Sequence, residues 1–135
     1  MRLTRSVCSP ACIVGLACAI LTPAAVGQMV WKKATPKANP GARGYLAMAY
    51  DSARQRMVMF GGFSLKSPLN GTWEYEGSTW VRRTVVTSPP VRGFHAMAYD
   101  AARRVVVMYG GRTSITATGV TLADTGAYGG KNRRQ

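Results

Sequence analysis

Two glutamates lie close enough in the sequence to be considered as a catalytic pair. Glu74 and Glu76 flank Tyr75 on one predicted strand, beside a predicted turn. A glycosidase uses two carboxyl groups on opposite sides of the scissile bond, supplied by separate positions of its scaffold. Only the spacing supports such a pair here, so we predict no catalytic residues and no enzymatic activity.

Metal-ligating side chains are sparse. His95 is the only histidine, and the three cysteines all lie near the N-terminus, at Cys8, Cys12 and Cys18. A single histidine without a second histidine or a cysteine nearby makes a weak metal site. We therefore predict no metal site and no cofactor, no disulfide in the rest of the chain, and a packed or turn-adjacent position for His95.

The chain is strongly basic. Its 18 lysines and arginines against 5 aspartates and glutamates give a net charge of +13. Such a charge attracts anionic partners. The basic residues are dispersed, however, mostly as arginines in predicted turns. We therefore do not expect nucleic acid as a partner, and a binder of anionic polymers is kept as an alternative function.

The N-terminal segment has the features of a secretory signal peptide. Arg2 and Arg5 supply a positive start, and residues 11–21 form an apolar run that is short for a membrane span. Small residues precede a cleavage site after Gly27. The sequence thus predicts a signal peptide over residues 1–27 and a secreted or periplasmic protein.

Two alternatives remain for this segment. The uncharged stretch continues from Ser6 to Trp31, which would also suit an uncleaved anchor, and only then do we expect a membrane partner. Cys18 would be the acylated residue of a lipoprotein, although Leu16 stands one position too close to it for the usual motif.

A repeat with an offset of 49 residues runs through the rest of the chain. Residues 43–51 match residues 92–100, and at the same offset residues 57–62 match residues 106–111. A period of this length with paired glycines is typical of four-stranded propeller blades.

The second copy diverges towards its end. Residues 122–135 align with residues 69–82 at an offset of 53, so about four residues would be inserted in the preceding loop. Thr125, Tyr128 and Gly130 keep their counterparts, but both tryptophans are lost, to Gly126 and Arg133.

Alternating side chains and turn residues predict four strands in the first repeat. These are expected at residues 45–51, 56–60, 72–75 and 79–85. Gly61 and Gly62 end the second strand, where the chain must bend tightly.

Residues 28–135 are therefore predicted to be all-β and to form about two four-stranded blades of an incomplete propeller. The repeats span about residues 43–91 and 92–135, and residues 29–37 are expected as an isolated fourth strand. Repeat arrays bury their core between neighbours, so two blades leave two faces open, and self-association is one way to cover them.

These repeats resemble the kelch repeats of secreted bacterial proteins, of the type found in the central domain of galactose oxidase. The residues that carry the resemblance are Arg43, Arg92, Gly61, Gly62, Gly110, Gly111, Tyr75 and Trp80. The resemblance implies a β-propeller that binds proteins or glycans through loops at one end of its central channel.

The copper radical chemistry of some relatives of that family uses a Tyr–Cys crosslink and paired histidines. The chain beyond the predicted cleavage site has no cysteine and only His95, which stands where the first repeat has Leu46. The resemblance therefore implies no such activity here.

We expect an exported binding or scaffold module for a protein or glycan partner. Two loops, residues 63–70 and 112–120, would supply its variable surface, and the candidate binding residues in them are Phe63, Lys66, Asn70 and Arg112. The other alternative is a truncated fragment of a larger propeller protein without a function of its own.

Overall fold

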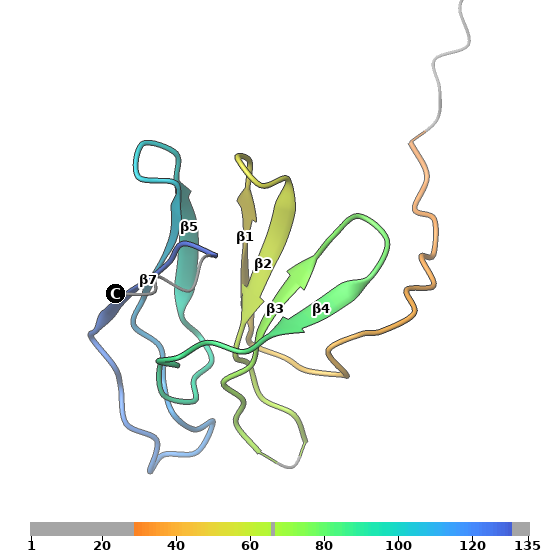
Figure 1. Ribbon diagram of the computed structural model, residues 1–135. Helices are drawn as coiled ribbons and strands as arrows, with labels where there is room; N and C mark the ends of the chain where they lie inside the picture. The colour runs from red at the N-terminus through yellow and green to blue at the C-terminus, as the bar shows by residue number, and fades with distance from the viewer. Residues whose placement is uncertain (1–28, 66, 131–135) are drawn as a thin grey trace, which may run out of the picture. The chain divides into compact units, whose positions relative to one another are not determined.

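The computed structural model describes residues 29–65 and 67–130. Contacts divide the chain into a unit that ends at Lys32 and a second unit from Lys33 to Gln135. The second unit holds the strands drawn in Figure 1, and the described residues contain no helix, so the all-β prediction is confirmed. In that part of the chain no helix of membrane-spanning length and hydropathy occurs. The predicted signal peptide lies outside the described residues.

The first sheet is an antiparallel meander of four strands in the order β1-β2-β3-β4. Its strands are β1 (Ala47–Asp51), β2 (Arg56–Phe60), β3 (Thr72–Tyr75) and β4 (Trp80–Arg83). The second and third strands have their predicted bounds, whereas β1 begins later than expected and β4 is shorter at both ends. Tyr45 accounts for the late start of β1, because its φ of 57° is left-handed and interrupts the extended backbone.

The second sheet has three strands in the order β5-β6-β7, also antiparallel. They are β5 (Ala96–Asp100), β6 (Val105–Tyr109) and β7 (Thr125–Tyr128). The position that corresponds to the start of β4 is Arg133, which lies outside the described residues. Neither sheet closes on itself.

Strand pairing and backbone conformation repeat at the same offsets as the sequence. Met57 pairs with Tyr75 in the first sheet, and Val106, 49 positions further on, pairs with Tyr128 in the second. The partner has moved by 53 positions, so the predicted insertion of four residues does lie between β6 and β7. Non-glycine residues of positive φ recur at the first offset as well, as Tyr45 with Phe94 and Gln55 with Arg104.

The core lies between the two sheets. Ala49 of β1, Val58 of β2 and Val106 of β6 form its buried centre. Partly buried side chains of the second sheet pack against this centre, namely Met97, Tyr99 and Tyr128. Because side chains alternate between the two faces of a strand, each sheet uses one face for this core.

Backbone hydrogen bonds join the two repeats at one end of the sheets. The N–H of Gly62 donates to the carbonyl of Arg92 at 2.8 Å, and the N–H of Phe94 donates to the carbonyl of Tyr45 at 2.9 Å. These bonds tie the two repeats together and give partners to backbone groups that buried segments must satisfy.

Residues 29–37, expected as an isolated fourth strand, form no strand in the structure. A strand needs a neighbour for its backbone ladder, and the chain first pairs with β4 only after this segment. There the N–H of Trp80 donates to the carbonyl of Ala38 at 3.3 Å, and the Ala38 N–H donates to Thr79 Oγ1 at 3.2 Å.

The equivalent glycines Gly61 and Gly110 provide a test of this junction. Both have positive φ, 65° and 70°, so a Cβ at either position costs about 1–2 kcal/mol through backbone strain. A Cβ at Gly61 would also lie 2.4 Å from the Arg92 carbonyl oxygen, whereas at Gly110 the nearest atom is the Leu122 oxygen at 3.3 Å. We predict that Gly61→Ala lowers the free energy of unfolding clearly more than Gly110→Ala. Urea titrations of the two variants measure this difference. Equal losses would contradict the close approach of Gly61 to the Arg92 carbonyl.

Candidate functional site

The carboxylate of Glu74 lies at the centre of an ionic cluster between the sheets. It is almost fully buried and accepts hydrogen bonds from Arg54 at 2.5 Å, Arg83 at 2.8 Å and Arg56 at 3.0 Å. The hydroxyl of Tyr128, which comes from the second sheet, donates to the same carboxylate at 3.0 Å. Three arginines from the first sheet and its turn thus hold a carboxylate that the second sheet covers.

The electrostatics of this cluster favour a structural role. Burial raises the pKa of Glu74, but hydrogen bonds from Arg54, Arg83 and Arg56 outweigh it and hold the pKa below its ordinary value of 4.5. A general acid at neutral pH needs the opposite shift. Glu76 shares Arg56 and Arg83 with Glu74, so both carboxylates of the pair act as counter-ions to the same arginines.

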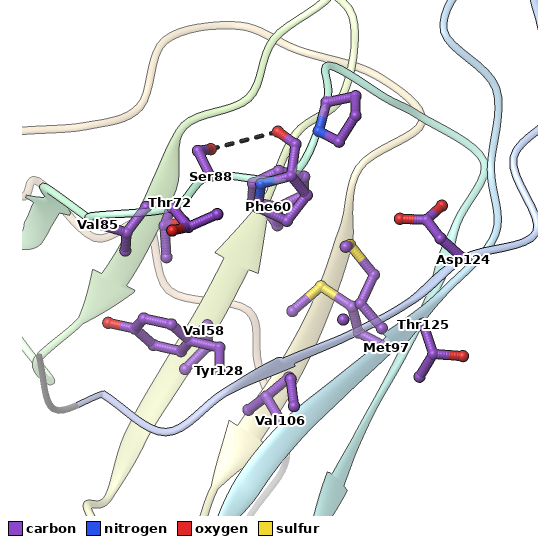
Figure 2. Close-up of a pocket in the computed structure, with 16 residues that line it drawn as sticks. Val58, Phe60, Thr72, Val85, Ser88, Met97, Val106, Asp124, Thr125 and Tyr128 are labelled. Carbon is purple, nitrogen blue, oxygen red and sulfur yellow. Dashed lines mark hydrogen bonds between the residues drawn. The ribbon is translucent and has the colours of Figure 1, made fainter. Parts of the chain in front are cut away.

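A cavity of about 410 Å³ lies between the two sheets beside the core, and Figure 2 shows the residues that line it. Its wall is mainly apolar, with Val58 and Phe60 of the first sheet on one side and Met97 and Val106 of the second on the other. The ring of Tyr128 also lines the cavity and lies beside Val58 in Figure 2.

The sequence explains why this space is open. Gly126 on β7 aligns with Trp73 on β3, so the second sheet lacks an indole at this position. A Cβ at Gly126 would lie 3.1 Å from Met108 Cε and 4.0 Å from Pro89 Cγ, two residues of the cavity wall. The lost tryptophan leaves a space that a small apolar group can enter.

Two half-exposed aromatic rings form a patch at the end of the sheets where the repeats join. Tyr45 and Phe94 occupy equivalent positions and stack with their centroids 4.2 Å apart. Phe63 lies beneath them, 5.9 Å from Phe94, and only a glycine at position 93 leaves room for it, because a Cβ there would lie 2.4 Å from its ring. Left-handed φ at both exposed aromatics is a backbone strain of the kind found at binding sites.

The four candidate loop residues have different environments. Phe63 is buried in the aromatic cluster, so its side chain is part of the packing beneath the surface. Asn70 is exposed. Arg112 is half-buried and donates to the carbonyls of Gly119 at 3.1 Å and Thr116 at 3.4 Å, which holds its own loop together. Lys66 lies outside the described residues.

The repeat residues of the predicted motif are structural in their contacts. Tyr75 and Trp80 pack with ring centroids 5.2 Å apart across the β3–β4 turn. The paired glycines all have positive φ, namely 65° at Gly61, 91° at Gly62, 70° at Gly110 and 103° at Gly111. They mark the bend that ends β2 and β6.

His95 is packed between the repeats, as the sequence predicts. It is almost fully buried, its ring lies 5.7 Å from that of Phe60 in an edge-to-face arrangement, and neither ring nitrogen has a hydrogen-bond partner. Burial, and then the charge of Arg92, lowers the pKa of His95 from 6.5 to about 4. The imidazole is therefore neutral at physiological pH.

The ion pairs of the structure were not predicted from the sequence. Asp51 and Arg54 pair across the first hairpin at 2.7 Å, and Asp100 and Arg103 pair across the second at the same distance. An Asp-x-x-Arg motif that repeats at the offset of 49 residues could have indicated these two hairpin ion pairs. Arg92, which is fully buried, forms a further pair with Asp124 that no local spacing indicates.

Comparison with known proteins adds no assignment. No protein-family model matches the chain, and a search of curated proteins finds no match either. Within residues 29–65 and 67–130, no three metal-ligating side chains of the His, Cys, Asp or Glu type gather in one place.

His95 makes the stability of the protein depend on pH. Its folded pKa of about 4 lies below its ordinary value of 6.5, so the unfolded chain binds a proton that the folded chain does not, and stability falls as the pH drops from 6.5 towards 4. Between about pH 7 and pH 5 this effect costs the native protein about 2 kcal/mol of unfolding free energy. We predict that His95→Leu, which introduces the residue of the first repeat, removes this loss. Urea unfolding at both pH values measures it, and an unchanged loss in the variant would contradict the burial of a neutral imidazole.

Glu74 controls the response to stronger acid. Its folded pKa is lowered, so its stabilising effect is complete above its ordinary value of 4.5 and is lost as the pH falls through the folded value. We predict that Glu74→Gln costs about 2 kcal/mol or more at neutral pH, because hydrogen bonds to charged groups are lost. Its stability should then decline less than that of the native protein below about pH 4.

Glu76→Gln is the matched control, since Glu76 contacts two of the same arginines but is one-third exposed. Chemical denaturation of both variants at neutral pH and below about pH 4 measures these effects. At neutral pH, Glu76→Gln should lose less free energy of unfolding than Glu74→Gln. A loss at Glu76 as large as that at Glu74 would show that burial between the sheets is not what makes Glu74 important.

Proposed function

We propose that this chain is an exported kelch-like repeat module that binds a protein or glycan partner and has no catalytic activity. Each sheet would be one blade of a propeller, and a second copy of the chain would cover each face that the two sheets leave open. Export rests on the N-terminal sequence, and the kelch-like assignment rests on the repeat and its paired glycines.

The observation that carries the proposal is a difference in exposure between equivalent residues. Phe60 of β2 is 4% exposed because the second sheet covers it, whereas its counterpart Tyr109 of β6 is 57% exposed. Ala49 and Ala98 differ in the same way. The outward face of the second sheet is the face turned away from the first sheet. It repeats the surface through which the first sheet contacts the second, but no described residue covers it.

The matching surface lies on the outward face of the first sheet. Met48 and Tyr50 are 49% and 52% exposed, while their counterparts Met97 and Tyr99 pack into the core between the sheets. Both halves of one interface are thus present on the same chain. A second copy can bind head to tail, and such contacts form a ring if the rotation closes.

The backbone at the junction supports the same arrangement. The N–H of Gly62 donates to the carbonyl of Arg92 in the next repeat. The equivalent N–H of Gly111 meets no backbone acceptor within the described ranges. A further repeat from a second copy would supply that acceptor.

Ligand contact would come from the aromatic patch at this junction. Tyr45 and Phe94 occupy equivalent positions and stack on each other. Added copies would extend the pair into a row of half-exposed rings. Aromatic faces of this kind suit protein side chains and sugar rings alike, because they bury a large area and lose little conformational entropy.

Light scattering after size exclusion of the full chain, with far-UV circular dichroism on the same peak, tests the assembly. We predict a β-rich oligomer of defined mass. Tyr109→Lys blocks the outward face of the second sheet, and Tyr50→Lys blocks that of the first, so each variant alone should be monomeric. An equimolar mixture should form dimers, because each variant keeps the face that the other has lost.

Ile115→Lys is the control, since this exposed residue lies in the loop between β6 and β7, away from both faces. It should assemble like the native chain. A folded monomer at every concentration, or dimers formed by either variant alone, would contradict head-to-tail assembly. Aggregated or unfolded native chain would favour a fragment of a larger propeller protein, whose further repeats cover these faces.

A further inference from the structure

Arg43 and Arg92 occupy equivalent positions at the start of the two repeats. Each guanidinium donates from its Nη1 to the carbonyl of the first glycine after the second strand, at 3.1 Å to Gly61 and at 2.9 Å to Gly110. The two side chains therefore point in the same direction relative to their own sheets.

The carboxylate partner of the two arginines differs. Arg92 binds both oxygens of Asp124, each at 2.8 Å, in a two-pronged ion pair. Asp124 precedes β7, and its counterpart before β3 is Gly71. Arg43 thus has carbonyl partners only, at Gly61 and Pro40.

The place where the missing carboxylate would lie is an open cavity of about 200 Å³. A Cβ on Gly71 would lie 3.0 Å from Trp73 Nε1 and 3.8 Å from Arg82 Nε, so N–H donors surround the position. The guanidinium of Arg43 lies over the Trp73 ring at 5.9 Å from its centroid.

The chain has no acidic side chain left for this position. It contains five aspartates and glutamates, and each already forms an ion pair with an arginine: Asp51, Glu74, Glu76, Asp100 and Asp124. Arg82 has no carboxylate partner in the described part of the chain. Burial, and then the charge of Arg82, lowers the pKa of Arg43, which reflects two cations without a counter-ion.

We propose that the cavity beside Gly71 is a binding site for the carboxylate group of an external ligand, held by Arg43, Arg82 and the indole N–H of Trp73. The bound carboxylate takes the place that Asp124 occupies in the second repeat. A planar carboxylate matches the two-pronged geometry of a guanidinium, which a spherical anion does not.

The size of the cavity limits the ligand to a terminal acidic group. A uronic acid residue of a glycan and an aspartate side chain of a peptide both present a carboxylate on a small body that can pack against the Trp73 ring. The site is formed by other residues than the aromatic patch of Tyr45 and Phe94, so it goes beyond the proposed binding surface, and it does not depend on self-association.

The indole N–H of Trp73 reports binding directly in nuclear magnetic resonance spectra of the full chain, with its signal assigned from Trp73→Phe. We expect a saturable shift of this signal with D-glucuronate or N-acetylaspartate, and no comparable shift with glucose or with chloride at matched ionic strength. A response to glucuronate alone identifies a sugar acid, and a response to N-acetylaspartate alone identifies an acidic peptide. No shift with either carboxylate, or the same shift with chloride, would overturn the proposal.

Variants at Gly71 and Arg82 complete the test. Gly71→Asp supplies the carboxylate from within the chain and should weaken binding by about tenfold or more, while raising the melting temperature above that of Gly71→Ala. Gly71→Ala adds the same Cβ, 3.0 Å from Trp73 Nε1, without the charge, and should weaken binding less than Gly71→Asp does. Arg82→Gln, at an exposed position, should also weaken binding.

Native-like affinity in both Gly71→Asp and Arg82→Gln would show that carboxylates bind elsewhere. Trp73 and Arg82 lie in register with Met59 and Met48 on the outward face of the first sheet, so light scattering of each variant is measured together with its affinity. A variant that loses carboxylate binding but keeps the oligomeric mass of the native chain makes failure of carboxylate binding and failure of self-association separate results.

Discussion

Arg92 connects the two sheets more completely than any other described residue. Its backbone carbonyl accepts the Gly62 N–H of the first sheet, and its own N–H donates to the Leu69 carbonyl at 3.3 Å. Its guanidinium, fully buried, binds the Gly110 carbonyl and Asp124 of the second sheet. A buried charge is tolerated only when its partners are complete. Arg92 thus contributes several of the bonds that fix one sheet on the other, beside the backbone bond from Phe94 to Tyr45 and the hydrogen bond from Tyr128 to Glu74.

Departures from exact repetition produce the features that could bind a ligand. Gly126 replaces an indole and opens the cavity between the sheets, and Gly71 replaces a carboxylate and leaves Arg43 without a counter-ion. Ala127 takes the position of Glu74 on β7, so the second sheet lacks the carboxylate that gathers three arginines on the equivalent face of the first. Each change removes a group that would stabilise the array, and two of them leave space of molecular size in its place.

Much of the fold follows from the sequence because the repeat is explicit. β2 and β3 lie where alternation and the paired glycines predict them, and Tyr128 has the predicted counterpart Tyr75. The local pattern could not predict partners that meet only after the sheets pack, such as Tyr128 with Glu74 or Arg92 with Asp124. Phe63 shows a related limit: a loop position indicates exposure, but the glycine at position 93 makes room to bury the ring.

An interface between two copies would be weaker than the interface within one chain. Across the internal junction Tyr128 donates to a buried carboxylate, whereas Tyr75 of a second copy would meet Ala127 and find no acceptor. Each copy also carries a net charge of +13, which opposes association at low ionic strength and less so when salt screens it. Assembly should therefore be reversible and favoured by salt. Binding of an anionic polymer would respond to salt in the opposite direction, because its affinity comes from the same charges.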